Sequence, residues 1–249
     1  NNESNTYDIN KAIYYLKLAA DKNHVESQFV LGCLFYKNKF IPNNIEKCIH
    51  YLKKAADNNY PKAQFNLAIL YYEGFYVIRD IKKSIYFFSL AQKNGMSDAS
   101  LNLGLIFLNG QYVDQSIPKA IEYLKIASNQ NNPKAQYNLA ILYSEGNHVK
   151  RDIVTALQYL TYAAENGFPQ AQCNLGLFYE IGNDVKQDIK KCLYYYQLAA
   201  YKNVPQAQYK LGCFNIEGRY VKQDINKGFN LLLQSSKNGF IPASLMIGF

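Results

Sequence analysis

The chain carries five cysteines and three histidines, the residue types that most often serve as metal ligands or nucleophiles. His24, His50 and His148 occur at unrelated places, and no two of them have the spacing of a ligand pair. The cysteines form no Cys-x-x-Cys motif. They are Cys33, Cys48, Cys173, Cys192 and Cys213. We therefore expect no metal site and no cofactor.

Acidic side chains do not indicate an active site either. Glu73, Glu145 and Glu217 each precede a glycine at the end of an apolar segment. A carboxylate repeated at a helix end is typically solvated. No glycine-rich phosphate loop follows a strand, because no strands are expected. The sequence predicts no catalytic residues, and we interpret the chain as a protein that is not an enzyme.

The cysteines suggest small buried hydrophobic side chains in the reduced state. Free thiols favour an intracellular, cytoplasmic setting. A secreted or lumenal setting stays open, because the sequence lacks an initiator methionine and its native N-terminus is not visible. No apolar run approaches the roughly 18 residues of a membrane span.

The formal net charge is +8, from 27 Lys and Arg against 19 Asp and Glu. One lysine row is spread evenly along the chain, which indicates a solvated outer face; the alternative is an acidic partner. That row is Lys11, Lys47, Lys83, Lys119, Lys191 and Lys227. No Arg-rich cluster or base-stacking motif supports nucleic acid as a partner.

The sequence does offer binding chemistry, in a stripe of apolar and aromatic residues at spacings of four and then three. An asparagine row runs beside this stripe. Together they predict a groove that holds a partner protein or peptide, and the exposed apolar surface is what a partner would cover. The predicted partner-binding residues are Phe29, Phe65, Asn66, Ile69, Tyr72, Leu101, Asn102, Leu105, Tyr137, Asn138, Ile141, Asn174, Leu177 and Tyr209.

Two interpretations of these rows stay open. The amides could hydrogen-bond an extended peptide backbone beside an exposed groove. Alternatively, neighbouring side chains fill the stripe and the asparagines only satisfy loop carbonyls. The segment from Phe65 to Leu108 is apolar throughout, whereas Ser144 and Glu180 make the later part more polar. We expect the tightest partner contact near the second and third repeats.

A 36-residue repeat must position these residues, since a large apolar residue followed by a small one recurs at that spacing. Self-similarity at this period is typical of a solenoid, in which each unit buries its core against its neighbours. The recurring pairs are Leu31-Gly32, Leu67-Ala68, Leu103-Gly104, Leu139-Ala140, Leu175-Gly176, Leu211-Gly212 and Ile247-Gly248.

Each repeat predicts two helices. The first begins near an Ala-Gln pair and ends at a glycine such as Gly146, or at Asn38 in the first repeat, where a left-handed residue closes the helix. A short loop leads to an N-cap such as Asp152, followed by isoleucine. The second helix then shows apolar residues at i, i+3, i+4 and i+7.

The frame A-Q-x-N-L-(G/A)-x-x-Y-x-x-G-x-x-V-x-x-D-x-x-K-A-x-x-Y-x-x-x-A-A resembles the Sel-one-like repeat (SLR), a relative of the tetratricopeptide repeat. The resemblance covers 8–249 and implies an all-α, right-handed α-solenoid that mediates protein–protein interaction. We expect a polar tail over 1–7 and one solenoid over 8–249. It would comprise a second helix of a partial repeat (8–25), six full repeats (26–241) and the start of another (242–249).

The sequence thus favours a non-catalytic scaffold or adaptor. Two alternatives stay open: a self-assembling, dimeric structural module, and a regulatory or activator region of a larger enzyme complex. The final ASLMIGF has no second helix to cover it. Solenoid ends need polar caps, so this end suggests either a longer native chain or a homodimer formed through it.

Overall fold

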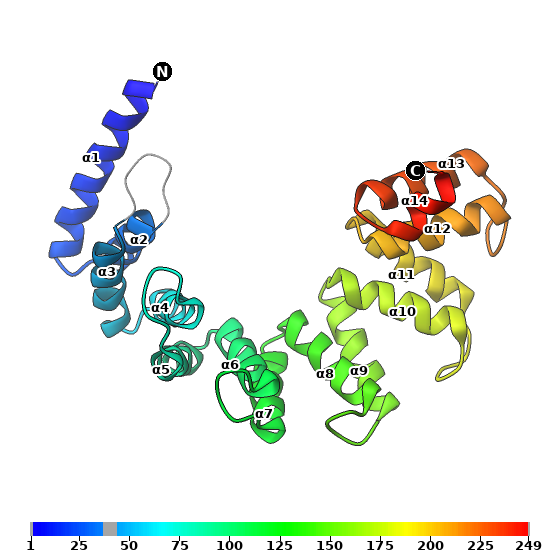
Figure 1. Cartoon of the computed structure of the whole chain (residues 1–249), viewed down its shortest axis with the longest axis horizontal. Helices are drawn as coiled ribbons and strands as arrows, with labels where there is room; N and C mark the ends of the chain where they lie inside the picture. The colour runs from blue at the N-terminus through cyan, green and yellow to red at the C-terminus, as the bar shows by residue number, and fades with distance from the viewer. Residues whose placement is uncertain (1, 37–43, 249) are drawn as a thin grey trace. The chain divides into compact units, whose positions relative to one another are not determined.

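The structure is a computed structural model and describes residues 2–36 and 44–248. These residues form fourteen helices and no strand (Figure 1). The helices are α1 (Asn2–Asp21), α2 (Val25–Tyr36), α3 (Ile45–Asp57), α4 (Pro61–Glu73), α5 (Ile81–Lys93), α6 (Ser97–Asn109), α7 (Ile117–Asn129), α8 (Pro133–Glu145), α9 (Ile153–Glu165), α10 (Pro169–Ile181), α11 (Ile189–Tyr201), α12 (Pro205–Glu217), α13 (Ile225–Lys237) and α14 (Ile241–Ile247).

The helices form hairpins, and the hairpin is the repeating unit. Repeats one to six are the pairs α2/α3, α4/α5, α6/α7, α8/α9, α10/α11 and α12/α13. The chain divides into two compact units, Asn1–Ala127 and Ser128–Phe249, and the repeat continues through both. Within each unit, a helix packs on the helices that precede and follow it, for example α4 on α3 and α5. The fold is an all-α solenoid of 36-residue helical hairpins, as the sequence predicted.

The N-terminal segment differs from the expectation. Helix α1 begins at Asn2, so the stretch expected to be a polar tail is helical from its second residue. The sequence from Asn2 to Tyr7 contains neither glycine nor proline. Nothing in it therefore stops the helix from extending toward the N-terminus.

The first helix of each repeat starts and stops as the sequence indicates. Four of these helices begin at a proline in their first turn, two residues before the expected Ala-Gln start. The glycines that follow five of the first helices adopt φ angles of 62° to 75°, a conformation that a Cβ disfavours. They are Gly74, Gly110, Gly146, Gly182 and Gly218. Asn38, expected in this role in repeat one, lies outside the described residues.

The second helices have side-chain N-caps. In Asn44, Asp80, Asp152, Asp188 and Asp224 a side-chain oxygen accepts a hydrogen bond from the backbone N–H three residues later, at 2.9–3.0 Å. Such a bond satisfies one of the orphaned donors of the first turn. The backbone N–H of the same residue donates to a carbonyl in the preceding helix, such as Asp152 to Tyr143 at 2.8 Å. This pair of bonds fixes how the second helix leaves the loop.

A buried glutamine links successive repeats, a feature that the sequence analysis missed. Gln64 donates to the carbonyl of Ala56 at 3.1 Å and accepts from Asn94 at 2.9 Å. It thus joins the end of the preceding repeat to the end of its own second helix. Gln136 and Gln208 also accept from asparagines, Asn166 and Asn238.

The glutamine link is incomplete in repeat five. Gln172 donates to the carbonyl of Ala164 at 3.0 Å, but its side-chain oxygen is buried without a partner. Lys202 stands where the linked repeats carry asparagine. The side-chain oxygen of Gln28 in repeat one is also buried without a partner, because Asn58 donates to a backbone carbonyl of α3 instead. A buried acceptor with no partner costs about 1–3 kcal/mol.

We expect Lys202→Asn to stabilise the protein by about 1 kcal/mol, because the new amide can donate to Gln172. Urea unfolding followed by circular dichroism measures the change. Lys202→Gln is the matched control, since it removes the same charge and carries an amide on a longer side chain. An equal gain from both substitutions would contradict the glutamine explanation.

Small residues let the two helices of each repeat approach closely. A Cβ placed on Gly32 would lie 2.7 Å from Leu52, and one on Gly104 would lie 2.8 Å from Leu124. Repeats two and four tolerate alanine at this position, as Ala68 and Ala140. A small residue of the first helix thus packs against a large residue of the second helix.

Stacked rings connect the two helices at another place. In repeats one to five, a ring from the first helix lies nearly parallel to a ring from the second, with centroids 5.9–6.1 Å apart. In four of these repeats, a lysine of the predicted row lies 5.0–5.5 Å from the first ring's centroid, within cation–π range. The lysines therefore have a structural contact in addition to their solvent exposure. They are Lys47, Lys83, Lys119 and Lys191.

Candidate functional site

The predicted stripe lies along the first helices, and most of its residues are half-buried. Three of its aromatic members are each covered by the residue that caps the start of the next repeat's first helix. Phe29 packs on Tyr60, Tyr137 on Phe168 and Tyr209 on Phe240, with ring centroids 5.1–5.2 Å apart. Much of the stripe is therefore used to pack one repeat on the next.

The other stripe residues differ in exposure. Leu101 is buried in the core, whereas Leu177 is 38% exposed. Phe65 packs edge-on against Phe88, and Tyr72 against Tyr112. Half-buried members with free surface include Ile69, Leu105 and Ile141.

The amide groups of the asparagine row donate to atoms of the protein itself. Asn102 and Asn138 each donate to the carbonyl four residues earlier in their own helix, at 2.7 Å. Asn174 donates to the Tyr137 hydroxyl at 3.2 Å, and Asn66 to the Cys33 sulfur at 3.5 Å. These partners are helical carbonyls and side chains, not the loop carbonyls considered above.

Within the two units, residues of the stripe and of the asparagine row from adjacent repeats lie together at a repeat junction. We call this place the junction site. At the first junction it is a cavity of about 190 Å³, mainly apolar, in the N-terminal unit. The residues that line it are Cys33, Tyr36, Leu52, Asn66, Ile69 and Leu70. It therefore brings the predicted Asn66 and Ile69 together with Cys33 and Tyr36, at the first junction rather than between repeats two and three.

Five of these six positions line a much smaller cavity at the junction of repeats four and five. The cavity there is about 20 Å³ and is lined by the equivalent residues, among them Ile141, Asn174 and Phe178. Ile141 replaces Cys33 and Phe178 replaces Leu70, so larger side chains occupy the space. The two larger side chains accompany the smaller cavity, although Ser144 in that cavity is smaller than its equivalent Tyr36.

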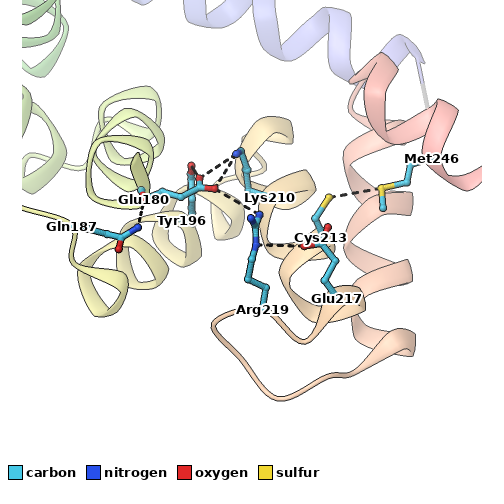
Figure 2. Close-up of polar contacts among 8 residues, drawn as sticks. All are labelled: Glu180, Gln187, Tyr196, Lys210, Cys213, Glu217, Arg219 and Met246. Carbon is cyan, nitrogen blue, oxygen red and sulfur yellow. Dashed lines mark hydrogen bonds and ion pairs between the residues drawn. The ribbon is translucent and has the colours of Figure 1, made fainter. Parts of the chain in front are cut away.

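Charged residues occupy the junction site between repeats five and six (Figure 2). The Glu180 carboxylate, 10% exposed, accepts a hydrogen bond from the Tyr196 hydroxyl at 2.7 Å and pairs with the Lys210 ammonium at 3.1 Å. The Arg219 guanidinium lies 3.9 Å away and also contacts Glu217 at 3.4 Å. Burial raises the pKa of Tyr196, and the hydrogen bond to Glu180 raises it further.

This cluster satisfies its own groups. Glu180 is one of the residues that make the later stripe polar, and Lys210 stands at an asparagine-row position. The structure shows that the two residues face each other across one junction (Figure 2). Within the described residues at the next junction, the Cys213 sulfur lies 3.7 Å from the Met246 sulfur.

The described cysteines are all free thiols. Burial raises the pKa of Cys48 and Cys192 to about 12, and both side chains are fully buried. Burial also raises the pKa of Cys33, although the Asn66 hydrogen bond opposes part of that effect. A thiol that stays protonated is a poor nucleophile, so these groups act as packing atoms.

We expect the free energy of unfolding to fall as the pH rises from about 9 toward 12. Below about 9, both the folded and unfolded states keep the Cys48 and Cys192 protons. Above it, only the unfolded chain releases them until the pH reaches the folded pKa of about 12. The loss should be smaller in Cys48→Ala/Cys192→Ala, and urea unfolding at pH 8 and pH 11 measures the difference. Equal losses in the two proteins would contradict it.

In the part of the chain that the structure describes, no group of three or more His, Cys, Asp and Glu could hold a metal ion. No helix among these residues has both the length and the hydropathy for crossing a bilayer.

The fold and its junction sites define a solenoid of short helical hairpins. A family model, the Sel1 repeat, matches residues 6–24, 25–60, 61–96, 97–132, 133–168, 169–204 and 205–240. Because these matches cover nearly the whole sequence, the chain belongs to the Sel1 repeat family. Proteins with such repeats are generally non-catalytic scaffolds that mediate protein–protein interactions. No curated protein matches the chain.

Solved structures agree with this assignment. A protective antigen of uropathogenic Escherichia coli with an SLR fold has a TM-score of 0.85 and 24% identity; the match covers 95% of this chain and 50% of that one. The chain therefore spans about half the length of that antigen. A Sel1 repeat protein from Oxalobacter formigenes has a TM-score of 0.79 and 28% identity, with 95% and 99% coverage. An immunity protein from Pseudomonas aeruginosa shares the fold at a TM-score of 0.53 and 19% identity, covering 89% and 87%.

Proposed function

We propose that the chain is a scaffold that holds a partner protein or peptide along the face carrying the junction sites. The observation that supports this most is the open apolar cavity at the first junction. An equivalent site in the same chain shows that this cavity can be closed by ordinary side chains. An unfilled apolar site is suited to an apolar partner side chain.

The chemistry of the lining defines what this site would accept. Leu52, Ile69 and Leu70 supply apolar walls, and the Tyr36 ring and the Asn66 amide lie beside them. An aliphatic or methionine side chain would remove these walls from water and contribute about 25 cal/mol per Å² of apolar area buried. Asn66 offers one polar group that can fix orientation, as specific sites usually require.

The later sites would contribute differently. The cluster of Glu180, Lys210 and Arg219 presents partly exposed cations beside a buried acid, with Lys210 34% and Arg219 48% exposed. Exposed charges of this kind select and steer partners more than they add affinity. We therefore assign the anchoring contact to the first junction and a selective contact to the charged one.

A capture experiment with lysate of the native host tests this function. Ile69→Glu places a charge at the cavity and should remove the captured partner, because burying an unpaired carboxylate is costly. Val154→Glu is the matched control, since Val154 is 80% exposed and lies in α9 away from the junction sites. Circular dichroism confirms that both variants stay helical. Capture that survives Ile69→Glu would place binding elsewhere and overturn the proposal.

A further inference from the structure

The sixth repeat lacks the stacked ring pair that the first five repeats share. Its two positions hold Asn215 in α12 and Leu231 in α13 instead of rings. The structure has a cavity of about 310 Å³ there, bounded by α11, α12 and α13. Its lining includes Asn215, Leu231, Lys227, Leu211, Gln197 and Tyr201. We call this cavity the ring slot.

The backbone around the ring slot keeps the arrangement of the other repeats. The Asp224 side chain caps α13 by accepting from the Lys227 N–H at 2.9 Å, as its equivalents do. The Asp224 N–H donates to the Asn215 carbonyl at 2.9 Å, again as in the other repeats. The frame is therefore unchanged, and the cavity includes the place where Asn215 and Leu231 stand instead of two stacked rings.

Lys227 holds the repeat position of the four lysines that lie over rings. In repeat six it lines the cavity instead, because Asn215 provides no ring below it. A cation beside an apolar slot of ring shape attracts the negative face of an aromatic group. Lys227 can thus form a cation–π contact with a bound ring, a contact that it does not form with a ring in the described part of this chain.

We propose that the ring slot of repeat six binds a phenol ring. A cavity of about 150 Å³ is enough to bind benzene, so about 310 Å³ has room for a phenol with one further carbon. Leu211 and Leu231 provide apolar contact with the ring, and Lys227 faces it. Asn215, a side chain only 5% exposed, donates its amide N–H to the Leu211 carbonyl at 2.7 Å, and its side-chain oxygen can accept a hydrogen bond from the hydroxyl group.

The ring can reach the slot as a small phenol or as a tyrosine side chain of a partner. NMR titration of the full chain with p-cresol and with a capped Gly-Tyr-Gly peptide separates these sources. We expect the Asn215 side-chain amide signal to shift, with a dissociation constant on the order of 0.1–1 mM. Tighter binding of the peptide assigns the slot to a partner's tyrosine, and tighter binding of p-cresol assigns it to a free phenol. Binding of neither ligand overturns the proposal.

Variants show whether the slot is responsible. The double variant Asn215→Tyr/Leu231→Tyr rebuilds the stacked ring pair of repeat five and should abolish binding. If the double variant does not fold, the single variant Leu231→Phe is tested in its place. Lys227→Thr, which copies Thr155 of repeat four, should weaken binding about two- to fivefold by removing the cation. Val154→Tyr adds a tyrosine at an exposed site and should bind as wild type does.

A non-aromatic ligand gives the last control. Cyclohexanol has a similar size and a hydroxyl group but no π-system, so it should bind at least about threefold more weakly than p-cresol. Equal binding of the two ligands would overturn the assignment to an aromatic ring. Binding that persists in the variants with a filled slot would overturn the location.

Discussion

Leucine at Gly176 is expected to lower the free energy of unfolding by about 3 kcal/mol. A Cβ at this position would lie 2.7 Å from Cδ1 and 2.9 Å from Cε1 of Tyr196. The ring cannot move aside easily, because it is 1% exposed and its hydroxyl is bound to Glu180. The two helices of repeat five would therefore have to separate. Urea unfolding followed by circular dichroism measures the loss.

Two further variants identify the cause of this loss. Gly176→Ala adds only the Cβ and should destabilise less than leucine, in the same direction. Lys190→Leu introduces leucine at an exposed position of α11 and should change stability by less than about 0.5 kcal/mol. If Gly176→Leu and Lys190→Leu unfold at the same urea concentration, the close packing of the two helices does not exclude leucine from position 176.

We expect the second large loss of stability when the Glu180 carboxylate is removed. Glu180→Ala leaves the buried Tyr196 hydroxyl and the half-buried Lys210 ammonium without their acceptor. Breaking one partner of a buried charged network costs about 3 kcal/mol, and the hydroxyl contributes part of that cost. We expect a fall of about 3 kcal/mol in the free energy of unfolding.

Paired substitutions distinguish the contribution of the charged network to stability from the effect of losing one side chain. Glu180→Ser/Lys210→Asn copies Ser144 and Asn174 at the junction of repeats four and five. It should cost less than the sum of its single variants, because it leaves no unpaired charge. Glu217→Ala removes an exposed acid and should cost under about 1 kcal/mol. A Glu180→Ala cost as small as that of Glu217→Ala would show that the cluster does not stabilise the fold.

The helices and their ends could be predicted from local sequence. Aspartate or asparagine N-caps and left-handed glycines act within a few residues, and they occur where they were expected. The small residues were also predictable, because Gly32 and its equivalents recur at a fixed period. The prediction of a polar tail before the first helix was wrong, because a polar sequence without a helix breaker is compatible with either a tail or a helix.

Contacts between repeats could not be predicted with the same confidence, because their partners are about 30 residues apart. The glutamine of each Ala-Gln pair marked a helix start, yet its role as a link depends on an asparagine at the end of the second helix. The lysine row likewise indicated solvent, whereas the rings beneath it lie on another helix. Glu180 and Lys210 were visible as exceptions, but only the packing of α12 on α10 and α11 pairs them.

The stripe shows where one sequence pattern serves two purposes. Phe29, Tyr137 and Tyr209 pack on rings that precede the next repeat's first helix, while Ile69 lines an open cavity. Spacing alone does not separate these cases, because both need an apolar residue at the same position. The size of the residues opposite, Cys33 and Leu70 against Ile141 and Phe178, distinguishes the open site from the filled one.

The affinity of the captured partner for a variant with a filled cavity tests the central proposal most directly. Cys33→Ile/Leu70→Phe copies the residues that nearly close the site between repeats four and five. Isothermal titration calorimetry should show at least about tenfold weaker binding than wild type, as loss of an anchoring contact implies, with Lys190→Leu unchanged. Unchanged affinity in the folded, filled variant would contradict the account and exclude the first junction as the anchoring site.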